Sequence, residues 1–219
     1  MNNDAWNKFK SARKAFRSMT EKLKSVAKKP NEIVYNGTLD EIRKEHEIKY
    51  ILVADNPGCS ELKQGRYLAG ETERDAGKIA RKFFHEKLDI DFDKEVIVLN
   101  KTPIHTPSTE KLRELRSEDI FKKSQKNMAS ILFDFHKALN VPVWIVGING
   151  MKKGGIFRVY TDTLKELYSK ADSLYKNLFL FKHFSRNCFN NDLKGLSDKN
   201  LKESLKEKGS EYRKRILGN

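Results

Sequence analysis

Residues 50–70 read YILVADNPGCSELKQGRYLAG and set the pattern that the rest of the chain follows. The run from Tyr50 to Ala54 is short, apolar and rich in branched side chains, which predicts a buried β-strand. The polar turn of residues 55–58, Asp-Asn-Pro-Gly, comes directly after it. Loops at the carboxyl ends of parallel strands form the binding crevice of an open α/β sheet. The stretch therefore predicts a strand that carries Asp55 and Asn56 to a functional edge.

The same pattern of apolar runs and helical periods continues along the chain. Further strands are predicted at 95–99, 142–146 and 178–181, and helices at 71–84, 117–139, 159–170 and 197–217. A short edge strand at 33–35 and a short helix at 39–45 precede the first long strand, and Ser117 is the predicted cap of the long central helix. Strands separated by helices favour parallel pairing with right-handed crossovers. The predicted fold class is α/β, a three-layer α/β/α sandwich with a four-stranded, mainly parallel sheet.

Several residues at the predicted strand ends are polar or glycine. They are Asp55, Asn56, Asn100, Gly147 and His183. Because the carboxyl ends of parallel strands share one edge of a sheet, we expect these residues to lie close together. The long segment 102–116 is the predicted rim of that site.

The charge of the chain favours a polyanionic partner. Its 219 residues carry a formal net charge of +14, with an isoelectric point near 9.6. Lysine and arginine side chains that neutralise phosphates gain affinity by releasing counterions, so we favour nucleic acid as the partner. A lysine-rich surface that serves only solubility is the alternative.

Cysteine content and hydropathy bear on the compartment and on cofactors. Cys59 and Cys188 are the only cysteines, too few for a disulfide framework or for the four thiolates of an iron–sulfur cluster. No apolar run is long enough for a transmembrane span, and the N-terminus has no run of signal-peptide type. We therefore expect a cytoplasmic monomer that has no membrane contact, metal or cofactor.

The chain divides into an N-terminal helix and one domain. Residues 1–29 place aromatic and aliphatic side chains at helical spacing with lysines between them, which predicts a basic amphipathic helix ended by Pro30. Docking of its aromatic face on the core is favoured over membrane anchoring. Residues 30–219 form the predicted single domain, since this length buries one sizeable core.

Three motifs in register resemble the uracil-DNA glycosylase superfamily. The first is Asp55-Asn56-Pro57-Gly58, six further residues, then Gly65-Arg66-Tyr67-Leu68. The second is Asn100 at the end of a strand, and the third is His183-Phe184-Ser185. Together they span about residues 50 to 190. The resemblance implies a uracil-DNA glycosylase-like fold and a hydrolase of base excision repair, which removes uracil or another deaminated base from DNA.

The resemblance also implies roles for individual residues. Asn56 falls at the position that orients the attacking water in several branches, with Asp55 as the alternative, although both residue types also simply form turns. His183 matches the histidine that donates to the base as negative charge develops there. Asn100 matches the asparagine that reads the base edge, and an amide can donate and accept together.

The remaining expected site residues contact the base or the DNA backbone. The base would lie near Tyr67 and Leu68, whereas the family places phenylalanine at the position of Leu68. The DNA contacts would be Arg66, Lys101, Ser185 and Arg186. Because the stacking aromatic is displaced, a catalytically inactive or divergent nucleic-acid-binding protein of the same fold is the alternative function. Such a protein would bind DNA with a steep salt dependence and leave no abasic product.

Overall fold

The computed structural model describes residues 1–73, 75–108, 111–185, 188–194 and 200–218. Its centre is one sheet of four strands in the order β2-β1-β3-β4. The strands are β1 (Tyr50–Ala54), β2 (Val96–Asn100), β3 (Val143–Val146) and β4 (Leu178–Phe181). Every neighbouring pair is parallel. The predicted α/β class and the four-stranded sheet are confirmed, and the sheet is parallel throughout.

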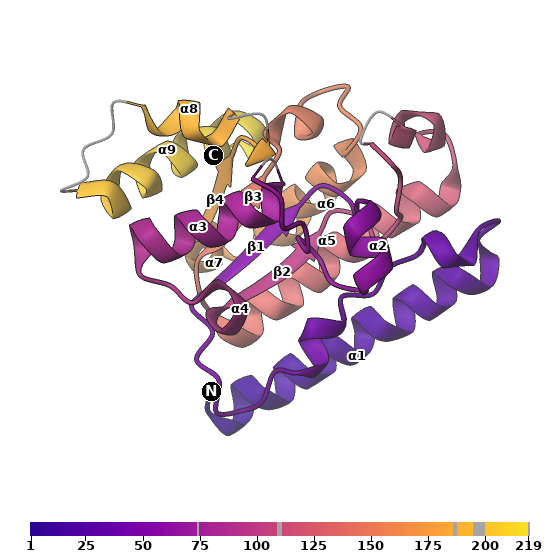
Figure 1. Cartoon of the computed structure of the whole chain (residues 1–219), viewed down its shortest axis with the longest axis horizontal. Helices are drawn as coiled ribbons and strands as arrows, with labels where there is room; N and C mark the ends of the chain where they lie inside the picture. The colour runs from indigo at the N-terminus through magenta and orange to yellow at the C-terminus, as the bar shows by residue number, and fades with distance from the viewer. Residues whose placement is uncertain (74, 109–110, 186–187, 195–199, 219) are drawn as a thin grey trace.

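Helices connect the strands and cover both faces of the sheet (Figure 1). They are α1 (Asn3–Val26), α2 (Cys59–Gln64), α3 (Ala76–Leu88), α4 (Phe92–Glu95), α5 (Asp119–Leu139), α6 (Arg158–Tyr168), α7 (Asp172–Lys176), α8 (Cys188–Leu193) and α9 (Leu201–Leu217). None of those described is both long and apolar enough to cross a membrane.

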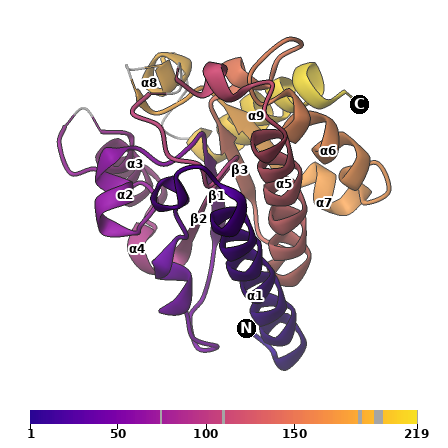
Figure 2. The ribbon, with the colours of Figure 1, turned by 90° about the vertical axis from the view of Figure 1, so that its right-hand side faces the viewer.

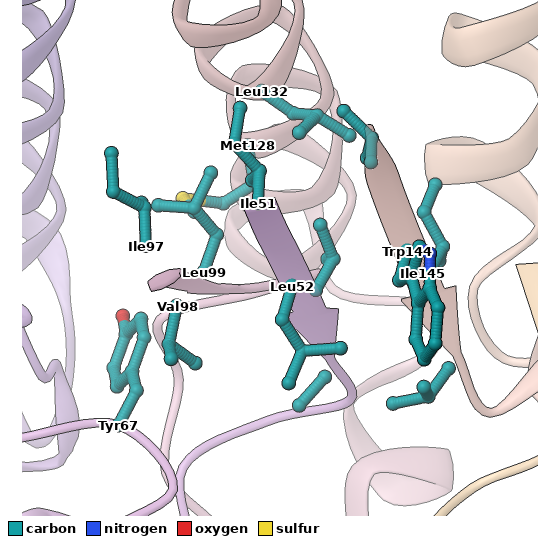
Figure 3. Close-up of a cluster of buried hydrophobic side chains, with 14 of the residues drawn as sticks. Ile51, Leu52, Tyr67, Ile97, Val98, Leu99, Met128, Leu132, Trp144 and Ile145 are labelled. Atoms are coloured by element: carbon teal, nitrogen blue, oxygen red, sulfur yellow. The ribbon is translucent and has the colours of Figure 1, made fainter. Parts of the chain in front are cut away.

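Alternation along the strands gives the sheet two apolar faces. Ile51, Ile97 and Leu99 point toward Met128 and Leu132 of α5 (Figure 3). The side chains between them point to the opposite face, where Trp144 contacts the rings of α3 and α8. Strands buried on both faces read as continuous apolar runs, which is why their sequence signal is strong.

The N-terminal helix packs against the central helix. α1 and α5 run side by side (Figure 2), and the rings of Phe9 and Phe135 lie 5.3 Å apart. Phe9 and Phe16 are fully buried, whereas the lysines on the other side of α1 are largely exposed. The aromatic face of this helix therefore completes the core, as the amphipathic pattern predicts.

Local elements differ from the predictions mainly at their ends. The expected edge strand at 33–35 is a single antiparallel bridge between Ile33 and Ile104, and the helix expected at 39–45 is a 3₁₀ turn, Gly37–Asp40. α5 begins at Asp119, because Glu118 and not Ser117 occupies the capping position. α3 begins at Ala76, since Asp75 before it has an extended backbone conformation.

Candidate functional site

A pocket of about 690 Å³ lies beyond the carboxyl ends of β1, β3 and β4. Its lining includes Asp55 after β1, Gly147 after β3 and His183 after β4. Arg113 and Arg116 line it from the segment that the sequence predicts as the rim. The parallel sheet thus brings together side chains that are far apart in the chain.

Asp55 is held by a buried lysine. Lys101 Nζ lies 2.5 Å from Asp55 Oδ1 and also donates to the Val146 carbonyl. The Lys101 side chain has no exposed surface, and its ammonium lies 5.0 Å from the centre of the Phe157 ring. Burial lowers the pKa of Lys101, and the Asp55 carboxylate opposes that effect. Lys101 was expected to contact DNA, but the structure places its charge inside the protein, where it pairs with Asp55.

Gly147 makes room for that carboxylate. Its φ is +85°, a left-handed conformation that glycine adopts easily. A Cβ built at this position would lie 2.3 Å from Asp55 Oδ1, which no real side chain tolerates. A glycine directly after β3 is therefore required by the position of Asp55.

His183 faces the same pocket and is oriented by Ser185. The Ser185 backbone N–H donates to His183 Nδ1 at 3.2 Å, and the Ser185 hydroxyl lies 2.8 Å from the same nitrogen. Because Nδ1 accepts a hydrogen bond, the neutral ring carries its proton on Nε2. Burial lowers the pKa of His183 below its ordinary value, and the Lys101 charge lowers it further against the effect of Asp55. Nε2 is therefore a neutral hydrogen-bond donor.

Asn56 does not share this environment. Its Nδ2 donates to Thr106 Oγ1 and to the Pro57 carbonyl, both at 3.1 Å. It is not among the described residues that line the pocket. Successive residues of an extended chain point in opposite directions, so Asp55 turns toward β3 while Asn56 turns toward the segment after β2.

A second polar cluster lies at the end of β2, which does not line the pocket. Asn100 is fully buried there, and neither polar atom of its amide makes a hydrogen bond within the described residues. The Glu61 carboxylate of α2 accepts from the backbone N–H groups of Gly58 and Leu68. Burial raises the pKa of Glu61, and the hydrogen bonds from the Gly58 and Leu68 N–H groups oppose that increase. Sequence reasoning missed Glu61, although its place three residues after Gly58 fits a helix cap.

The predicted base-binding residues lie in the core. Tyr67 is buried, with its hydroxyl donating to the Val34 carbonyl at 2.7 Å and its ring close to Phe16. Figure 3 shows its side chain beside Val98 of β2. Leu68 is also buried and has a φ of +51°. Neither is among the described residues that line the pocket.

The cations at the pocket differ from those the sequence singles out. Arg66 pairs with Asp93 and is not among the described lining residues, and Arg186 lies outside the described residues. Arg113 and Arg116 do line the pocket, and both are exposed. No ion pair is present for either of them within the described part of the chain. The sequence could have indicated Arg113 and Arg116 as pocket residues, because both are basic and lie in the segment predicted as the rim.

The described residues offer no ready metal site. No three His, Cys, Asp or Glu side chains among them are grouped so that they could hold an ion. Two ion pairs of the described residues include a residue that lines the pocket, Asp55 with Lys101 and Lys182 with Asp192.

Comparisons with known proteins identify no relative. No family model, no curated protein and no solved structure matches the chain. The chemistry of the pocket is therefore argued from its own residues.

Proposed function

We propose that this chain is a DNA glycosylase that hydrolyses the N-glycosidic bond of uracil or another deaminated base. The observation that carries the proposal is the placement of the Asp55 carboxylate and the His183 imidazole in one pocket beyond the strand ends. Hydrolysis of this bond leaves positive charge on the sugar and negative charge on the departing base. A carboxylate and a hydrogen-bond donor are the groups that stabilise such a separation.

Asp55 takes the water-orienting role in this proposal, in place of Asn56. Its Oδ1 is bound by Lys101, whereas Oδ2 makes no hydrogen bond within the described residues, so Oδ2 is free to accept from a water. The Asn56 amide is engaged by the segment after β2. A carboxylate also accepts the proton that the water loses, which an amide cannot do.

His183 supplies the donor to the departing base. Its Nε2–H makes no hydrogen bond within the described residues, and Ser185 fixes the ring through Nδ1. A neutral imidazole whose pKa is lowered keeps this proton arrangement at physiological pH. Ser185 therefore acts by orienting His183, in addition to the DNA contact expected from the sequence.

The arginines at the pocket bind the DNA backbone. Arg113 and Arg116 are exposed at the rim, and a guanidinium matches the geometry of a phosphate. The formal net charge of +14 supports a polyanionic substrate. We also propose, from the three sequence motifs, that the fold is of the uracil-DNA glycosylase type.

A panel of labelled oligonucleotides tests the function. Substrates with a single uracil, hypoxanthine or xanthine, in single-stranded and duplex form, are incubated with the protein and then treated with alkali. The proposal predicts strand cleavage at one or more of these bases and none at an undamaged control. Intact strands throughout the panel would contradict it.

The second candidate is a non-catalytic DNA-binding protein. The burial of Tyr67 favours it, because no aromatic ring of the first motif is left in the pocket to stack on a base. In that case the same oligonucleotides would bind with a steep salt dependence, and alkali would reveal no abasic sites.

A further inference from the structure

Lys101 is an unusual lysine because its charge is entirely enclosed. Its ammonium donates to Asp55 Oδ1 and to the Val146 carbonyl, and the Ala54 carbonyl lies at 3.5 Å. These three acceptors match the three hydrogens of the group. The backbone N–H of Lys101 also donates to the Ala54 and Asp55 carbonyls, at 3.0 and 3.1 Å. The lysine is therefore fixed relative to β1 by both its main chain and its side chain.

Burying such a charge costs free energy, and an apolar contact that only linked the two segments would avoid this cost. An apolar residue of similar volume often stabilises a protein as well as a buried ion pair does. Lys49 and Glu95 form an ion pair, at 2.6 Å, at the opposite end of the same sheet, and both side chains are partly exposed. Enclosure of the lysine therefore distinguishes the pair that lies at the pocket.

We propose that Lys101 is a positioning residue, which holds one oxygen of the Asp55 carboxylate so that the other faces the pocket. This inference rests on the proposed function. Lys101 itself does not touch the substrate, because its side chain has no exposed surface. It acts through Asp55, whose carboxylate lies in the space that a Cβ on Gly147 would fill.

The charge of Lys101 also acts on His183. Asp55 and Lys101 face His183 from the ends of β1 and β2, and Arg113 and Arg116 face the pocket from the rim. Lys182, next to His183, pairs with Asp192 of α8 at 2.5 Å. Of these groups, Asp55 raises the pKa of His183 and Lys101 lowers it. The His183 ring therefore reports on the Asp55–Lys101 pair in the absence of any substrate.

The test is a pH titration of the His183 ring by NMR in the unliganded protein, with its signals assigned by a His183→Gln variant. Lys101→Met keeps the length of the side chain and removes its charge, so the pKa of His183 should rise. Asp55→Asn should lower it. Lys49→Met, at the far end of the sheet, is the matched control and should leave it unchanged.

The outcomes separate this inference from the proposed function. If His183 titrates alike in the wild type and in Lys101→Met, the inference is overturned, whatever the protein does to DNA. If the pKa rises and the wild type cuts uracil-bearing DNA, the acid limb of the single-turnover rate profile should move to higher pH in Lys101→Met, and an unmoved limb would overturn the inference. If the pKa rises and the wild type cuts no DNA, only the proposed function fails.

Should Lys101→Met fail to fold, the same comparison is made in a neutral background. Adding Lys101→Met to Asp55→Asn leaves no charge unpaired, and the His183 pKa of the double variant should exceed that of Asp55→Asn alone. Equal values in the two proteins would overturn the inference.

Discussion

The edge where the four strands end has two halves that are built differently. The open half is formed by β1, β3 and β4, where a charged pair and a histidine lie at the pocket. The closed half is formed by β2, where Asn100 is completely enclosed and its amide makes no hydrogen bond to any described residue. Asp55 and Asn56 are neighbours in sequence and belong to different halves. Position in a motif therefore does not determine which residue reaches the pocket.

The largest effect is expected from His183 on the open half. His183→Ala should reduce the single-turnover cleavage rate by about 100-fold or more, because it removes a positioned donor to the leaving base. DNA binding, measured by fluorescence anisotropy, should persist. If the variant cleaves at the wild-type rate, the open half is not the reaction site.

The pH dependence of the same reaction has a definite sign. The pKa of His183 is lowered from 6.5, so the neutral ring that Ser185 can orient persists when the pH falls to 6.5 and below. The cleavage rate should fall only at more acidic pH, when Nδ1 takes up a proton and cannot accept from the Ser185 N–H. A rate already halved at pH 6.5 through His183 would contradict this assignment.

Two buried asparagines test the closed half. Asn36 and Asn100 both have no exposed surface, but Asn36 donates to the Val98 carbonyl at 2.9 Å and accepts from the Tyr67 N–H at 3.2 Å. Asn36→Leu leaves the Val98 carbonyl and the Tyr67 N–H without these hydrogen bonds. It should therefore lower the free energy of unfolding by about 2 kcal/mol more than Asn100→Leu does. Urea unfolding measures both. Equal losses would show that the Asn100 amide has a structural partner.

The cost of replacing two glycines by alanine tests how closely Asp55 packs against the backbone after β3. Gly147 and Gly154 have φ values of +85° and +78°, so alanine is strained by a similar amount at each. A Cβ on Gly154 meets nothing within 4 Å, whereas one on Gly147 collides with Asp55 Oδ1. Gly147→Ala should therefore cost about 1 kcal/mol more than Gly154→Ala in urea unfolding. Indistinguishable costs would mean that Asp55 moves away freely.

The smallest expected effect concerns the cations. Arg113→Gln and Arg116→Gln should each lower the slope of log affinity against log salt by about 1, because each removes one phosphate contact. Arg66→Gln is the control, since Arg66 is paired with Asp93 and is not among the described residues of the pocket. If only Arg66→Gln lowers this slope, the DNA binds on the closed half and the assignment of Arg113 and Arg116 is wrong.

Much of the fold could be predicted from the sequence, because continuous apolar runs mark strands that are buried on both faces. β1 and β4 have the predicted bounds, and β2 and β3 differ by one residue. The convergence of Asp55 and His183 follows from parallel topology. The burial of Lys101 and Tyr67 could not be predicted, because both residue types are usually partly exposed and only tertiary packing places them inside. The place of Glu61 three residues after Gly58 indicates a helix cap, but its second contact, with the Leu68 N–H, depends on the folded turn and could not be predicted.

The most direct test of the account is the single-turnover cleavage of a uracil-bearing oligonucleotide by the wild type, by Asp55→Asn and by Asn56→Ala. Asp55→Asn keeps the shape of the side chain and removes the acceptor of the water proton, so its rate should fall by about 100-fold or more while DNA binding persists. Asn56→Ala should retain most of the activity, because its amide binds Thr106 and is not among the described groups that line the pocket. A wild-type rate for Asp55→Asn together with an inactive Asn56→Ala would contradict the account and move the chemistry to the other half of the edge.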